Sequence, residues 1–196
     1  MKKKLCAALL ALAVVCPSLH AQKKVTETPE QKDKRMEWFY KAKLGIFIHW
    51  GVYAVKGVSE SWSFYNKYLP HDEYMKQCEG FTASKYDPKA WVELIKESGA
   101  QYTVLTTKHH DGVALWDTKQ NGISVVKNTP AKRDLVTPFV NEVRKAGLRL
   151  GLYYSLPDWS HPDYPNMTRT DVRYKDDPKR WDDFCKFNFA QLKELN

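Results

Sequence analysis

The stretch Tyr102-Thr-Val-Leu-Thr-Thr-Lys-His-His-Asp-Gly112 joins an apolar run to two histidines, an aspartate and a glycine. Polar side chains at the end of a buried strand suit a pocket better than a core, because buried polar groups need partners. The same layout occurs twice more: Leu44–Ile48 ends in His49-Trp-Gly51, and Leu148–Leu152 ends in Tyr153-Tyr-Ser155. The three runs predict one site at the carboxyl edge of a parallel sheet.

Helical segments separate these strand-like runs. Their predicted ranges are Asp87 to Gly99, with Trp91, Leu94 and Ile95 apolar, then Asp134 to Gly147, and finally Pro178 onward. Strands that alternate with helices predict an α/β fold with a parallel sheet and right-handed crossovers. A closed barrel needs roughly 200 residues or more. We therefore expect the first three or so units of a parallel (β/α)8 TIM-like barrel, truncated before its later strands.

The N-terminus is typical of a signal peptide. Three lysines follow Met1, Leu5–Cys16 is apolar, and Ala21 offers a small residue for cleavage. The apolar run is too short to span a bilayer, so no membrane span is predicted. Lipidation at Cys16 is a weaker alternative, because the bulky Val15 precedes it. Residues 1–21 should thus export the chain to the periplasm or the exterior.

The remaining sequence divides into a short lead-in and the barrel portion. Residues 22–42 are polar and charged, with a short helix expected near Lys34–Lys41, and residues 43–196 carry the truncated catalytic barrel. Cleavage of the leader removes three lysines and lowers the net charge from +8 to +5. That charge is dispersed, so no nucleic-acid partner is predicted.

Cysteines and aromatic residues leave two questions open. Cys78 and Cys185 remain after cleavage, and pairing and two free thiols are equally compatible with the sequence. Seven Trp, eleven Tyr and eight Phe fit either aromatic stacking on sugar rings or an ordinary large core. The cysteine spacing does not resemble that of a zinc site.

The candidate site residues follow the predicted strand ends. Neighbours on a regular strand point to opposite faces, so His109 and His110 can join His49 in one pocket only where the strand ends. Asp111 either orients an imidazole or simply belongs to the turn before Gly112.

Two further elements can contribute to the same pocket. Tyr153 and Tyr154 alternate along the third run, so one of them should face the site. In the loop after the first run, Trp62 can stack on a sugar and Glu60 can accept its hydroxyls, although loop packing would also explain both. The sequence has no Ser/His/Asp order, phosphate-binding glycine loop or dinucleotide fingerprint.

The matching residues together resemble the α-L-fucosidases of glycoside hydrolase family 29. The resemblance lies in the following segments, in the family's order: Lys43 to Gly51, Trp62 with Asn66, Phe81 to Trp91, Thr106 to Trp116, Arg133 to Leu135, and Gly151 to Trp159. It implies a catalytic barrel followed by a β-sandwich domain, acting as a retaining exo-hydrolase that releases terminal α-L-fucose from glycans. No cofactor and no metal is implied.

The resemblance also implies roles for single residues. His49, His109 and His110 would bind fucose hydroxyls, Trp62 would pack on the sugar, and Tyr153 would face the reacting carbon. Glu60 departs from the family pattern, because Ser61 separates it from the tryptophan.

The catalytic carboxylates are the larger departure from the family. The resemblance places the aspartate nucleophile at the end of the next strand and the acid/base further on, both beyond Asn196, so we expect this chain to be inactive alone. Two alternatives remain: a non-catalytic carbohydrate-binding remnant, and a metal-dependent barrel hydrolase that uses the three histidines.

Overall fold

A computed structural model describes residues 27–165 and 177–196. The predicted signal peptide therefore lies outside the described residues. The chain divides into two compact units, residues 1–37 and residues 38–196. The elements are α1 (Pro29–Ala42), β1 (Gly45–Ile48), η1 (Val52–Ala54), α2 (Trp62–Tyr65), α3 (His71–Met75), α4 (Gln77–Gly80), α5 (Pro88–Glu97), β2 (Tyr102–Lys108), α6 (Val125–Asn128), α7 (Val136–Lys145), β3 (Arg149–Tyr154) and α8 (Pro178–Glu194).

Helix α1 begins earlier than the sequence reading predicted. Its start is a reciprocal cap, in which Thr28 N–H donates to Gln31 Oε1 at 2.9 Å and Gln31 N–H donates to Thr28 Oγ1 at 3.3 Å. Such a cap satisfies two backbone groups that a helix end leaves free. The expected polar lead-in before Lys34 is therefore partly helical.

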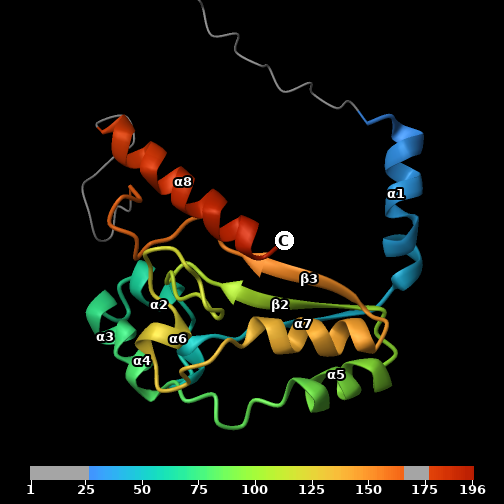
Figure 1. The fold of residues 1–196 in the computed structure, drawn as a ribbon, viewed down its shortest axis with the longest axis horizontal. Coiled ribbons are helices and arrows are strands. Elements are labelled where there is room, and N and C mark those ends of the chain that lie inside the picture. Colours follow the sequence, from blue (N-terminus) through green and yellow to red (C-terminus); the bar gives the residue numbers. More distant parts are fainter. Residues whose placement is uncertain (1–26, 166–176) are drawn as a thin grey trace, which may run out of the picture. The chain divides into compact units, whose positions relative to one another are not determined.

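The three predicted strands form one parallel sheet in the order β1-β2-β3. Its register pairs Ile48 with Leu105, and Leu105 with Leu152, so the three carboxyl ends lie at one edge. Figure 1 shows α5 and α7 on one face of the sheet, and the short helices α2, α3, α4 and α6 near the ends of the strand arrows.

The core between the sheet and helices α5 and α7 is apolar. Val92, Ile95, Leu105, Phe139 and Val143 are buried there. Leu94, which the helical spacing also suggested as apolar contact, is instead 65% exposed because it lies on the outer side of α5.

A second apolar cluster supports the loops at the carboxyl edge. It includes Val52, Phe64, Tyr74, Leu115 and Trp116. The long segment after β1, expected as an aromatic loop, is thus packed and carries four short helices.

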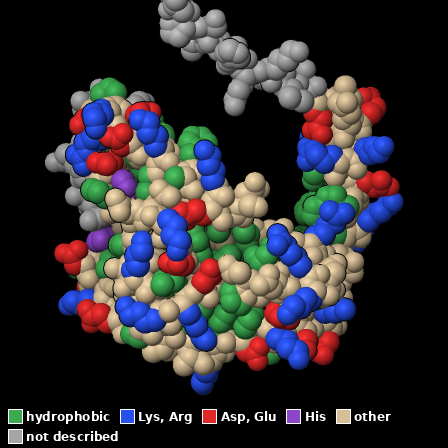
Figure 2. Space-filling model, viewed as in Figure 1, with side chains coloured by type: hydrophobic (Ala, Val, Ile, Leu, Met, Phe, Trp, Pro, Cys, Tyr) green, Lys and Arg blue, Asp and Glu red, His purple; other side chains and the backbone are tan. Residues whose placement is uncertain are grey.

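The remaining observations concern the surface charge, membrane-spanning helices and the two cysteines. Figure 2 shows Lys and Arg side chains mixed with Asp and Glu on the face drawn, without a single-sign stripe there. Within the described residues, no helix is long and apolar enough to cross a membrane. Cys78 and Cys185 are both unpaired.

Candidate active site

A shift in register at the end of β2 brings the histidines together. Leu105 packs on the helix side of the sheet, so Thr106, paired with Tyr153, lies on the opposite face. The ladder is then irregular between Thr106 and Lys108, and Lys108 pairs with Tyr154. An extra residue in one strand reverses the alternation beyond it. Lys108 therefore turns toward α8, and His109 lies beside His49 in the pocket.

The three histidine rings form a continuous cluster. The centroid of the His109 ring lies 4.9 Å from that of His49 and 4.7 Å from that of His110. Tyr153 joins them from β3, with its ring 6.0 Å from that of His109 and 6.5 Å from that of His49. The structure thus brings the three histidines and Tyr153 into one cluster of ring contacts.

Hydrogen bonds fix one nitrogen of each imidazole. Tyr53 Oη lies 2.8 Å from His49 Nδ1, and Ser61 Oγ lies 2.8 Å from His109 Nδ1. His110 Nδ1 lies 3.0 Å from the Pro157 carbonyl oxygen. These contacts engage Nδ1 of every ring, and Ser155 Oγ also lies 3.5 Å from Nε2 of His110.

Trp62 lies beside this cluster and is 42% exposed. Its ring meets His110 edge to face, with the centroids 6.0 Å apart. Trp159 contacts both rings. Its ring stacks on that of His110 with the centroids 4.2 Å apart, and its centroid lies 5.0 Å from that of Trp62. Glu60 precedes the buried Ser61 in a left-handed conformation with φ of 36°. Its carboxylate opposes the lowering of the His110 pKa that burial causes.

Burial disfavours protonation of two of the three histidines, His109 and His110. Burial, with smaller contributions from His110 and His49, lowers the pKa of His109 to about 3. Burial also lowers the pKa of His110. Neutral imidazoles can both donate to and accept from hydroxyl groups. His109 and His110 are therefore suited to hydrogen bonding with the hydroxyl groups of an uncharged ligand.

Two buried carboxylates near the histidines, those of Asp111 and Asp158, interact with other groups of the protein. Burial raises the pKa of Asp111 to about 6, and its oxygens accept from the Tyr74 hydroxyl at 2.6 Å and the Val113 N–H at 2.9 Å. Asp158 forms an ion pair with Lys108 at 3.2 Å. Neither is placed to attack a ligand, and Asp111 supports the turn rather than orienting an imidazole.

Sequence reasoning missed several supporting residues. Tyr53, Ser61 and Trp159 each contact a pocket histidine, but they come from loops whose course no strand or helix pattern predicts. Lys108 was also overlooked, because the alternation reverses only through tertiary packing. In the part of the chain that the structure describes, no group of three His, Cys, Asp or Glu residues is arranged to hold a metal ion. Residues 27–165 and 177–196 therefore offer no geometric support for the metal-dependent alternative.

Comparisons with known proteins agree on one family. The family model described as alpha-L-fucosidase matches residues 12–196. Tissue alpha-L-fucosidase of Bos taurus is 36% identical over 142 residues, which cover 65% of this chain and 30% of the bovine protein. The chain thus spans less than a third of that relative.

Solved structures give the same result. Alpha-L-fucosidase isoenzyme 1 from Paenibacillus thiaminolyticus aligns with a TM-score of 0.73 and 38% identity, covering 84% of this chain and 40% of that one. A Bacteroides thetaiotaomicron GH29 alpha-L-fucosidase, trapped as a covalent intermediate with 2-fluoro-fucosyl fluoride, aligns with a TM-score of 0.71 and 37% identity. The alignment covers 83% of this chain and 38% of that one.

Proposed function

The chain belongs to the α-L-fucosidase family, and on that premise we propose that it is part of an exo-acting retaining glycosidase that releases terminal α-L-fucose from glycans. The trapped covalent intermediate of the Bacteroides relative supports a retaining reaction. The parallel sheet supports a place for these residues as the first three units of a (β/α)8 barrel.

The histidine cluster at the carboxyl edge of the sheet carries this proposal. His49, His109 and His110 come from the ends of two neighbouring strands and would offer ring nitrogens to sugar hydroxyls. Trp62 would supply an aromatic face beside them, and Tyr153, whose ring lies 6.0 Å from that of His109, would face the reacting carbon. The Glu60 carboxylate would accept a hydrogen bond from a sugar hydroxyl.

The catalytic carboxylates would come from the part of the relatives that these 196 residues do not cover. Retaining hydrolysis needs two carboxyl groups about 5 to 5.5 Å apart across the sugar. The buried acids beside the cluster, Asp111 and Asp158, are both engaged in protein contacts. We therefore assign this segment to sugar binding, and we propose export through residues 1–21.

The test is hydrolysis of an aryl α-L-fucoside by the full-length natural protein. We expect turnover, with α-L-fucose as the first product seen by NMR, and no turnover of the matching aryl β-D-galactoside. Replacing His109 by Ala should raise KM, because the sugar loses a hydrogen-bond partner. The isolated 196-residue chain should be inactive.

Two outcomes would contradict the proposal. Turnover by the isolated chain would show that it supplies its own carboxylates. Fucose binding without turnover by the full-length protein would instead favour the carbohydrate-binding alternative.

A further inference from the structure

A fully buried lysine lies directly before the two pocket histidines. The Lys108 side chain has no exposed surface, and its Nζ pairs with Asp158 Oδ2 at 3.2 Å, itself nearly buried. An unpaired charge in such a place is strongly unfavourable. A buried ion pair nevertheless adds little net stability compared with apolar side chains of similar volume. Stability alone therefore does not account for this pair.

The ammonium group joins four parts of the fold. Besides Asp158, three oxygens lie near Nζ: Tyr154 Oη at 2.8 Å, Gln191 Oε1 at 3.1 Å and Asn188 Oδ1 at 3.4 Å. The three N–H donors of the ammonium group are shared among these four acceptors. Tyr154 belongs to β3, whereas Asn188 and Gln191 belong to α8. One side chain thus holds β2, β3, the loop after β3 and α8 together behind the pocket.

Asp158 connects Lys108 to the turn that contacts the histidine cluster. Its Oδ1 accepts the backbone N–H groups of Ser160 at 3.1 Å and His161 at 2.9 Å, which fixes the turn. Trp159, which directly follows Asp158, donates its backbone N–H to the His110 carbonyl oxygen at 2.8 Å. Its indole ring stacks on the imidazole of His110 with an angle of 17° between the planes.

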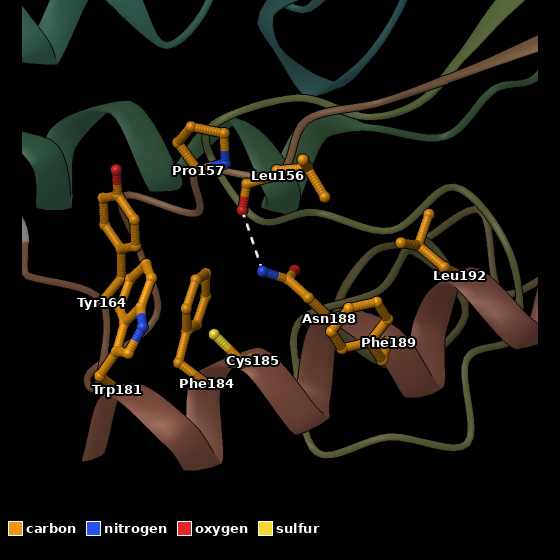
Figure 3. Close-up of a pocket in the computed structure, with 9 residues that line it drawn as sticks. All are labelled: Leu156, Pro157, Tyr164, Trp181, Phe184, Cys185, Asn188, Phe189 and Leu192. Carbon is orange, nitrogen blue, oxygen red and sulfur yellow. Dashed lines mark hydrogen bonds between the residues drawn. The ribbon is translucent and has the colours of Figure 1, made fainter. Parts of the chain in front are cut away.

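Helix α8 holds the same loop from the other side. Asn188 Nδ2 donates to the Leu156 carbonyl oxygen at 3.1 Å, as Figure 3 shows. The next carbonyl, that of Pro157, lies 3.0 Å from His110 Nδ1. Leu156 and Pro157 also line an apolar hollow of about 270 Å³ against α8. The position of His110 is therefore set by a loop that Lys108 and its partners hold at both ends.

We propose that Lys108, through Asp158, is a positioning residue that holds His110 and Trp159 in the geometry that binds the sugar. The identity of that sugar rests on the proposed function, but the positioning does not. Lys108 itself contacts no substrate, because it points to the opposite side of β2 from His109.

The test combines kinetics with NMR on the full-length protein labelled with ¹⁵N-histidine. In Lys108→Met we expect kcat/KM for an aryl α-L-fucoside to fall on the order of 100-fold, as small displacements of binding groups do. The ring signals of His110 should shift as its stacking on Trp159 changes. The signals of His49, which is held by Tyr53, should stay in place.

The double variant Lys108→Met/Asp158→Asn separates positioning from stability. It leaves no unpaired buried charge, so its Tm should recover above that of Lys108→Met. Its kcat/KM and its His110 signals should nevertheless remain altered. Lys179→Met, which removes an exposed pair with Asp183, is the matched control and should change neither readout.

The outcomes distinguish this proposal from the proposed function. If the double variant recovers kcat/KM together with Tm, or if the His110 signals do not move in either variant, Lys108 is merely structural and the proposal is wrong. If the wild type does not cleave fucosides, the function is wrong, whereas the NMR signals still decide whether Lys108 positions His110.

Discussion

His109 links the pocket to the acid stability of the fold. Its pKa is about 3 in the folded chain, against 6.5 for an ordinary histidine. The His109 imidazole is therefore protonated below pH ~6.5 in the unfolded chain but only below pH ~3 in the folded chain. This residue lowers stability as the pH falls through that window, by up to about 1.4 kcal/mol per pH unit, and has no such effect above it.

Replacing His109 by Gln should remove that pH dependence. We expect the free energy of unfolding of the variant to fall less steeply than that of the wild type between pH 6.5 and pH 4.5, with parallel curves above pH 7. Urea denaturation of the full-length protein across this range measures the difference. Parallel curves throughout would show that His109 titrates normally in the folded chain.

Gly112 allows the turn after the histidines to approach Asp158. Its φ is 78°, and a Cβ there would lie 2.5 Å from Asp158 Oδ1. Gly57 has a similar φ of 63° but open space around it. Gly57→Ala should cost about 1 kcal/mol for backbone strain alone. Gly112→Ala should cost a further ~1–3 kcal/mol for the clash, measured by chemical denaturation. Equal costs would mean that Asp158 moves aside freely.

At the scale of the elements, helix α5 depends on a single cap. Asp87 accepts the N–H of Ala90 at 3.1 Å, and Pro88 occupies the first turn. Asp87→Ala should lower the free energy of unfolding by roughly 0.5–2 kcal/mol, whereas Asp87→Asn should keep most of it. The cap is remote from the histidines, so KM should not change. An equal loss in both variants would assign the effect to charge rather than to capping.

The elements that the sequence predicts well are those with local signals. The apolar runs place all three strands within about two residues, and Asp87 and Asp134 each accept backbone N–H groups at a helix start. The irregularity before Lys108 has no local signal, because it depends on how β3 and α8 pack against β2. For the same reason the sequence predicts the histidine cluster but not the residues that support it.

The chain as a whole leaves large apolar side chains in contact with solvent. Phe47 lies on the pocket face of the sheet, and Leu156 and Phe189 lie near the hollow against α8. Among the described strands, β1 and β3 each pair on one side only. Open strand edges and apolar patches favour association. We therefore expect the isolated 196-residue chain to aggregate, which sedimentation velocity would show.

Phe189 is 66% exposed. Its substitution tests whether this surface is covered, because the effect should differ between the isolated chain and a longer protein. In the isolated chain, Phe189→Lys should increase the soluble fraction, because a charge breaks the apolar patch. In a longer protein that completes the proposed barrel, the same substitution should lower Tm, because the added parts would bury the charge. Tyr68→Lys, at a side chain that is 79% exposed in a loop, is the control and should change neither quantity. A Phe189→Lys protein with unchanged Tm would mean that this face of α8 stays open to solvent in the complete molecule.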